Sequence, residues 1–172
     1  MKIKNAWICR FKNNAVEPLF GDIDIADGKI SGIDKKPFEP HKVFNEIIKE
    51  KDVINAKGCV VTIPNINFHD HFYSRLAKGL PMAGLMDNFH NILKSLWWKV
   101  DTSLDREMII ASAQLGILDS VKNGVTYIFD HHSSPRATNG SLQAIADVFN
   151  DLGANGVICF ETSDRNGHQL AE

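Results

Sequence analysis

Residues 58–71 read GCVVTIPNINFHDH, an apolar and β-branched run that ends in two histidines separated by one residue. Such a run predicts a buried strand. Because side chains alternate across a strand, His69 and His71 are expected to point to one side at its carboxyl end, with Asp70 turned away. Two imidazoles on one face can hold one divalent ion. A His-x-His pattern alone is a weak signal in a chain with seven histidines, and its place after a strand strengthens it.

Two later segments repeat this design. Residues 124–132 read GVTYIFDHH, and residues 156–164 read GVICFETSD. Each is a short apolar run that ends in ionisable side chains, and helical patterns lie between the runs. This order is typical of a parallel α/β protein, whose functional sites gather at the carboxyl ends of the strands.

The clearest helix is predicted between the first two of these strands. Thr102 or Ser103 can cap its N-terminus, and Gly124 lies just past its expected end. Its expected buried face consists of apolar residues at spacings of three and four: Leu104, Met108, Ala111, Leu115 and Leu118. Similar patterns predict helices over residues 89–96 and 142–152.

The first 60 residues read instead as a small β unit. Residues 2–11 predict a strand, and a hairpin follows in which Asp27 and Gly28 favour a type I′ turn. We therefore expect two domains. One is an incomplete β-sandwich-like unit over residues 1–60, and the other is an α/β domain over residues 61–172.

Composition restricts the classes of partner. The net charge is −2, which gives no electrostatic reason to expect nucleic acid or an anionic membrane as a partner. No apolar run approaches the ~20 residues of a membrane span, and the first residues lack the apolar core of a signal peptide. The three cysteines are widely spaced and form no CxxC pair, so reduced thiols in a cytoplasmic protein are expected.

The stretch Ile63–His71 resembles the signature of the metal-dependent amidohydrolase superfamily, in which a Pro-Gly pair and hydrophobic residues precede His-x-His. Asn65 stands where the glycine is usual. Further similarities, above all to the SsnA-type aminohydrolases, which are relatives of chlorohydrolases and guanine deaminases, lie in Leu96–Asp101, Gly124–Pro135 and Glu161–Gly167. The resemblance covers essentially the whole chain and concerns the N-terminal part of such enzymes.

The resemblance implies a fold and a metal site. The fold is a (β/α)8 TIM barrel, of which residues 61–172 would form about the first three β/α units, following a small β-rich unit. A complete barrel typically needs ~250 residues. His69 and His71 would be two ligands of a divalent metal ion, Zn²⁺ or Fe²⁺. Two further histidines and an aspartate come from later strands in the resembled enzymes, and no residue of this chain matches them.

The function implied by the resemblance is hydrolysis of non-peptide C–N bonds in a small-molecule substrate, by deamination or amide hydrolysis with metal-activated water. No acid or base catalyst is assigned within this chain, and we expect the isolated 172-residue chain to be inactive. The alternative is a truncated or split chain that binds a partner or a metal without turnover. An incomplete barrel would expose strand edges and an apolar face, so a homo-oligomer or a complementing chain is expected.

The remaining candidate residues follow the later strands. Alternation directs only one of His131 and His132 toward a barrel interior, where it would contact substrate or support the metal ligands. The other interpretation is that both are polar strand-end residues that cap the next loop. Glu161 and Asp164 occupy positions suited to acid or base catalysis, but we expect ordinary loop roles because no partner is evident for either.

Overall fold

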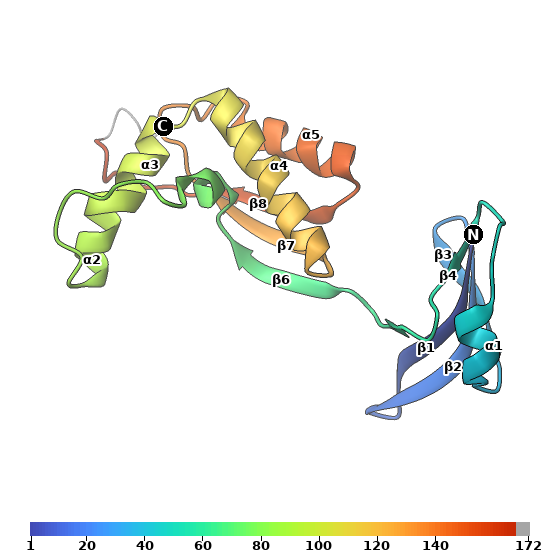
Figure 1. Ribbon diagram of the computed structural model, residues 1–172. Coiled ribbons are helices and arrows are strands. Elements are labelled where there is room, and N and C mark those ends of the chain that lie inside the picture. The colour runs from blue at the N-terminus through green and yellow to red at the C-terminus, as the bar shows by residue number, and fades with distance from the viewer. Residues whose placement is uncertain (168–172) are drawn as a thin grey trace. The chain divides into compact units, whose positions relative to one another are not determined.

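The computed structural model describes residues 1–167. The chain divides into two compact units, Met1–Ile63 and Pro64–Glu172, and each unit is built on its own sheet (Figure 1). None of the helices within residues 1–167 combines the length and the apolarity that crossing a membrane requires.

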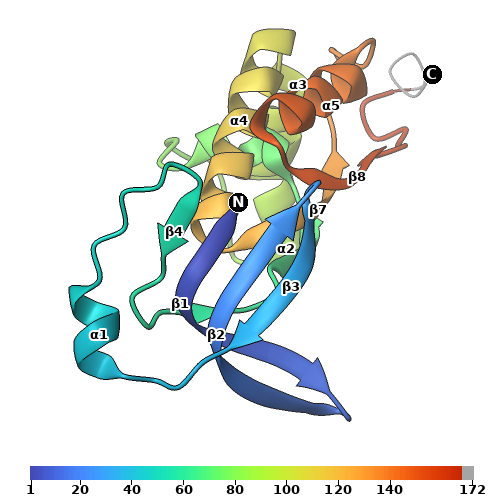
Figure 2. The ribbon, with the colours of Figure 1, turned by 90° about the vertical axis from the view of Figure 1, so that its right-hand side faces the viewer.

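The first unit is a five-stranded sheet in which β3, β2, β1 and β4 are neighbours in that order and β5 also pairs with β1 (Figure 2). The first three strands are antiparallel, whereas β4 and β5 run parallel to β1. The elements are β1 (Lys2–Lys12), β2 (Ala15–Ala26), β3 (Lys29–Lys35), α1 (Pro40–Asn45), β4 (Val53–Asn55) and β5 (Val60–Val61).

Two tight turns connect the antiparallel strands of this unit. Asp27 and Gly28 have φ values of 51° and 71°, and a type I′ turn requires positive φ at both positions. The predicted hairpin is therefore present. A second turn at Asn13 and Asn14, with φ values of 52° and 57°, joins β1 to β2. Asparagine tolerates this left-handed conformation, and β2 starts at Ala15, directly after the turn.

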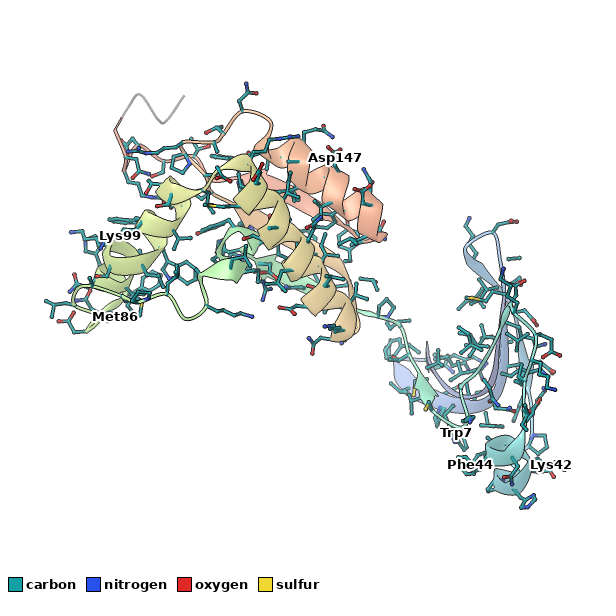
Figure 3. All side chains as sticks on the ribbon, turned by 45° about the horizontal axis from the view of Figure 1, so that its top comes forward. Trp7, Lys42, Phe44, Met86, Lys99 and Asp147 are labelled. Carbon is teal, nitrogen blue, oxygen red and sulfur yellow. The ribbon has the colours of Figure 1, made fainter. Side chains whose placement is uncertain are left out.

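Aromatic side chains pack α1 and the segment before it against the first sheet. The ring centroid of Phe38 lies 5.3 Å from that of Trp7, 4.8 Å from that of Phe20 and 6.4 Å from that of Phe44 on α1. Figure 3 shows Trp7 and Phe44 at the same end of this unit. These separations are typical of packed aromatic pairs. Aromatic packing through Phe38 therefore connects the short helix α1 to the sheet.

The second unit has a three-stranded parallel sheet in the order β6-β7-β8, with α4 and α5 side by side on one face (Figure 1). Its elements are β6 (Asn65–Asp70), η1 (Phe72–Ala77), α2 (Phe89–Ile92), η2 (Leu93–Trp97), α3 (Trp98–Ser103), α4 (Arg106–Lys122), β7 (Val125–His132), α5 (Ser141–Leu152) and β8 (Asn155–Phe160). The η1 segment is a 3₁₀ helix and η2 is a π-helical turn. The mixed α/β class and the parallel order of the strands agree with the prediction.

The first strand of this sheet differs in extent from its prediction. The apolar run that precedes the histidines does not form one strand. Val60 and Val61 pair with β1 in the first unit, and β6 begins only at Asn65. Pro64 lies between them and has no N–H to donate to a ladder, which explains why the strand is interrupted there.

The predicted start of α4 is also wrong. Asp105 is the N-cap, because its side chain accepts a hydrogen bond from the N–H of Met108 at 2.8 Å. Thr102 and Ser103 instead finish α3, where their hydroxyls donate to main-chain carbonyls one turn earlier. The predicted end is correct, because the helix stops at Lys122 before Gly124.

The buried face of α4 is not the predicted one. Met108 and Leu118 remain 46% and 48% exposed. The buried residues are mostly small: Ile109, Ser112, Ala113, Gly116, Ile117 and Ser120. A Cβ atom on Gly116 would lie 2.4 Å from Cδ1 of Phe72 in η1. Small side chains therefore let α4 approach η1 closely, and close packing determines which face is buried.

Candidate metal-binding site

His69 and His71 lie at the carboxyl end of β6 with their rings edge to face. The two Nε2 atoms are 3.0 Å apart. Asp70, between them, points to the opposite side and is 8% exposed. The alternation of side chains predicted this orientation, and the backbone of β6 produces it.

The hydrogen-bond partner of His71 determines which of its nitrogens carries a hydrogen. Its Nδ1 atom lies 2.8 Å from the main-chain carbonyl oxygen of His131 on β7. A carbonyl oxygen can only accept, so Nδ1 of His71 donates, and Nε2 of the neutral ring carries a lone pair and accepts from the ring of His69. The hydrogen between the two rings therefore belongs to Nε2 of His69. A second ring nitrogen that donates to a carbonyl is the usual arrangement of a metal-ligating histidine.

The two histidines fit a divalent metal ion. Nitrogens bound at ~2.0–2.1 Å to one zinc ion lie no more than about 4.2 Å apart, and the observed Nε2 separation is 3.0 Å. Within residues 1–167, however, no group of three or more histidine, cysteine, aspartate or glutamate side chains is placed to hold an ion. The described residues would therefore supply at most part of a ligand set.

Two polar side chains of β6 hold the backbone around these histidines. Asn67 accepts a hydrogen bond from the N–H of His69 at 3.3 Å and donates to Oδ2 of Asp70 at 2.6 Å. Oδ1 of Asp70 accepts from the N–H of His71 at 2.8 Å, and Arg75 pairs with Oδ2 at 2.5 Å. The register with β7 shifts between Asn67 and Asp70. Such irregularities re-aim side chains near functional sites.

His131 lies on the same side of the sheet as the two candidate ligands. Its ring centroid is 4.3 Å from that of His69 and 5.9 Å from that of His71. Its Nδ1 atom is buried and has no hydrogen-bond partner among the described residues. His131 therefore contributes its carbonyl to His71 and its ring to the packing of His69.

His132 points to the opposite face and is fully buried. Its Nε2 atom lies 2.8 Å from Oγ of Ser134, and its ring packs against those of Tyr73 and Phe160. Burial lowers the pKa of His132 to about 4, so the ring is neutral at physiological pH. As alternation predicts, only one residue of the pair reaches the side of the candidate ligands.

Asp130 is a buried carboxylate beneath the site that the sequence pattern did not single out. Its Oδ1 atom accepts a hydrogen bond of 2.8 Å from the N–H of Phe72, the residue after His71. Burial raises the pKa of Asp130 to about 6, although this hydrogen bond opposes the shift. The side chain therefore links β7 to the chain just after the second candidate ligand.

A second polar cluster joins α3 to the ends of β7 and β8. Nη2 of Arg165 lies 2.5 Å from Oδ2 of the buried Asp101, and the same guanidinium pairs with both carboxylate oxygens of Glu161. Oγ of Ser133 lies 3.2 Å from Nη2 of Arg165. Burial raises the pKa of Asp101 and opposes ionisation of Glu161, whose pKa is nevertheless lowered by hydrogen bonds from Arg165.

This cluster corrects one expectation. Glu161 was expected to lack a partner, and it is paired with Arg165 on the adjoining turn. Asp164 forms no side-chain hydrogen bond or ion pair within the described part of the chain, and its carbonyl accepts from the N–H of Gly167. Sequence reasoning missed Asp101 and Arg165, because nothing local connects residues so far apart along the chain.

No protein-family model matches the chain. Among curated proteins, the 5-methylthioadenosine/S-adenosylhomocysteine deaminases of Bacillus cereus strain AH187 and of Bacillus anthracis are 27% identical to it over 120 residues. The match covers 70% of this chain and 23% of each relative. The chain therefore matches only about a quarter of the length of these relatives.

Solved structures share the fold at low sequence identity. Escherichia coli guanine deaminase has a TM-score of 0.69 at 14% identity, over 99% of this chain and 39% of that one. An atrazine chlorohydrolase from Arthrobacter aurescens TC1, complexed with zinc and atraton, has a TM-score of 0.61 at 18% identity, over 92% and 35%. 5-Methylcytosine deaminase from Klebsiella pneumoniae has a TM-score of 0.62 at 19% identity, over 93% and 36%.

The TM-scores show a common fold, and the deaminase relatives add a match in sequence. Together they confirm the resemblance that begins with the His-x-His strand. The chain is similar to the N-terminal portion of enzymes of the amidohydrolase superfamily.

Proposed function

We propose that the chain is the N-terminal portion of a metal-dependent hydrolase that breaks non-peptide C–N bonds in small molecules by deamination or amide hydrolysis. In this proposal the sheet of β6, β7 and β8 with its helices forms the first units of a (β/α)8 barrel. The deaminase names of the sequence relatives support the class of reaction, and guanine and 5-methylcytosine deaminases among the structural neighbours support the fold.

One observation carries the proposal. The Nε2 atoms of His69 and His71 converge to 3.0 Å, and the carbonyl of His131 fixes the tautomer that leaves a lone pair on His71. The two nitrogens are close enough to bind one ion, once the hydrogen that Nε2 of His69 directs at His71 has moved to Nδ1 of His69. A third and a fourth ligand would come from strands beyond the described residues.

The residues of this chain hold and orient the site. His69 and His71 would bind a Zn²⁺ or Fe²⁺ ion, which when bound supplies a water of lowered pKa, near ~7, as the nucleophile. Asp130 anchors the chain immediately after His71 through the N–H of Phe72. His131 stands on the same side, and its buried Nδ1 has no hydrogen-bond partner among the described residues.

Metal binding tests the role of the two histidines directly. Titration of the metal-free chain with Zn²⁺ or Ni²⁺ in a calorimeter should show weak, substoichiometric binding, because two imidazoles fill half of a tetrahedral shell. His69→Ala and His71→Ala should each remove this binding. His90→Ala, an exposed histidine on α2, is the matched control and should bind as the parent does. Equal binding by all four proteins would place the metal elsewhere.

Activity tests the reaction. The isolated chain should show no measurable turnover of guanine, other aminated heterocycles or simple amides, because geometry loose by even ~1 Å can cost ~100-fold in rate. Supplying the remainder of the barrel, in one polypeptide or as a second chain, should produce metal-dependent release of ammonia. This activity should vanish in His69→Ala. Robust turnover by the isolated chain would overturn the assignment of the missing ligands.

The second candidate function is a split or truncated chain that binds a partner or a metal without turnover. It is favoured by the absence, within residues 1–167, of a third ligating side chain beside the histidines. Partner capture without ammonia release, in the presence of a complementing chain and metal, would support it.

A further inference from the structure

A pocket of about 550 Å³ lies between η1, the segment that follows it, α3 and α4. Volumes of ~300–1,000 Å³ are usual for small-molecule sites. Most of its wall is apolar and comes from Leu76, Leu80, Leu96, Val100, Leu104 and Met108. Tyr73 also lines it, and its ring lies 5.6 Å from that of His71. None of the described histidines lines the pocket.

The serine hydroxyls of this pocket already donate their hydrogens to main-chain carbonyls of the protein. Each of the three serines in the wall donates to a main-chain carbonyl: Ser95 to Leu85 at 3.1 Å, Ser103 to Lys99 at 2.6 Å and Ser112 to Tyr73 at 3.4 Å. A hydroxyl has one hydrogen to give. These groups therefore offer a ligand little donor capacity.

Lys99 is the charged group of the pocket, and Figure 3 labels it on α3. Its ammonium donates to the carbonyl of Ala83 over a long 3.4 Å. An ammonium has three hydrogens, and within residues 1–167 no carboxylate forms an ion pair with this one. A positive charge with spare donors thus stands at an otherwise apolar pocket.

We propose that this pocket binds a small apolar carboxylate. The hydrocarbon part lies among the leucines and Val100, and the carboxylate accepts hydrogen bonds from Lys99. The apolar wall supplies most of the binding, because removing the hydrocarbon chain from water is the main favourable contribution. Lys99 supplies the preference for an anion over a neutral or cationic head group. The site requires no metal, so it stands independently of the proposed hydrolase function.

The test uses decanoate as the probe, with decanol and decylamine as probes of equal chain length. Calorimetric titration of the metal-free full chain should give saturable binding of one decanoate per chain. Decanoate should bind at least threefold more tightly than decanol, which is about the effect of a partly exposed ion pair, and decylamine should bind most weakly.

Two substitutions locate the site. Lys99→Gln should reduce decanoate binding to the affinity of decanol and leave decanol binding unchanged, whereas Lys94→Gln, an exposed lysine outside the pocket, should change neither. Ser103→Phe places a ring at the rim of the pocket and should weaken both probes at least tenfold. Gln114→Phe adds the same ring to the exposed side of α4 and should have no effect. Circular dichroism establishes that each variant is folded.

The opposite results overturn the proposal. If the folded wild-type chain shows no saturable binding of decanoate, the proposed site is excluded. Equal affinity for decanoate and decanol excludes Lys99 as the selecting group. Binding that survives Ser103→Phe but is lost in Phe68→Ser would place the probe on the aromatic face of the sheet instead.

Discussion

Arg165, in the turn after β8, reaches the buried carboxylate of Asp101 on α3, with Nη2 2.5 Å from Oδ2. The guanidinium also lies over the ring of Trp98, 5.8 Å from its centroid. One side chain thus connects the helical segment formed by α2, η2 and α3 to the carboxyl end of the sheet, where the two candidate metal ligands lie.

Replacing Arg165 by glutamine should destabilise the second unit by about 3 kcal/mol, because it leaves the Asp101 carboxylate buried without its cation. Urea unfolding followed by helical ellipticity measures this loss. Arg136→Gln, on an exposed arginine without an ion pair in the described part of the chain, should change stability by less than about 0.5 kcal/mol.

The double variant Asp101→Asn/Arg165→Gln should recover at least half of that loss, because the uncompensated charge is gone. Equal losses in the single and the double variant would show that the contact contributes by packing and not by charge.

Acid stability should depend on two buried groups with opposite effects. The pKa of Asp130 is raised by burial from 3.8 to about 6, so the folded state takes its proton first and stability rises as the pH falls from about 6 to 3.8. The pKa of His132 is lowered by burial from 6.5 to about 4. The unfolded state then takes that proton first, and stability falls over almost the same interval.

The two effects should nearly cancel in the wild type between pH 7 and pH 4. Asp130→Asn retains an oxygen for the N–H of Phe72 but removes the compensating titration. It should lose about 3 kcal/mol over this interval relative to its own stability at pH 7. Unfolding measured with a chelator present checks this difference. Parallel pH profiles for the two proteins would contradict it.

Gly116→Ala should destabilise the second unit by about 2 kcal/mol. Alanine gains up to ~1 kcal/mol in helix propensity, but its Cβ would lie 2.4 Å from Cδ1 of Phe72 in a packed interior. Gln114→Ala on the exposed side of the same helix is the control and should be nearly neutral. A more stable Gly116→Ala variant would show that η1 can move away at little cost.

The face of the sheet opposite α4 and α5 should drive self-association. Phe68 is 71% exposed, and its ring stacks on that of Phe129 at 5.5 Å, with Tyr127 a further 5.5 Å along. Exposed apolar patches of this kind favour association. Sedimentation velocity should show oligomers that diminish in Phe68→Ser. Phe11→Ser, at a side chain of similar exposure in the first unit, should leave them unchanged.

Local patterns were sufficient for much of the fold and for the orientation of the candidate ligands. Alternation along β6 placed His69 and His71 on one side, and the same rule separated His131 from His132. The helix predicted over residues 142–152 is present as α5, and Gly153, with φ of 68°, follows its last residue. In each case the physical cause acts over a few neighbouring residues.

Features that depend on distant residues escaped prediction. Hydrophobic periodicity chose the wrong face of α4 because Ser112 and Gly116 are buried for their small size. The pairing of Arg165 with Asp101 joins residues separated by 64 positions. No local pattern encodes that contact, so the cluster around Asp101 became visible only in the folded unit.

The order β6-β7-β8 has a directional consequence. Each step along the chain moves one strand further from β6 in the same sense, and within the described residues β6 pairs only with β7. If later β/α units continue this progression, the final strand must close the ring against β6. The seam of the cylinder would then run beside the histidine pair. Closure of the ring would then also complete the ligand set. A metal ion bound by residues on both sides of this junction would hold the first and last strands together.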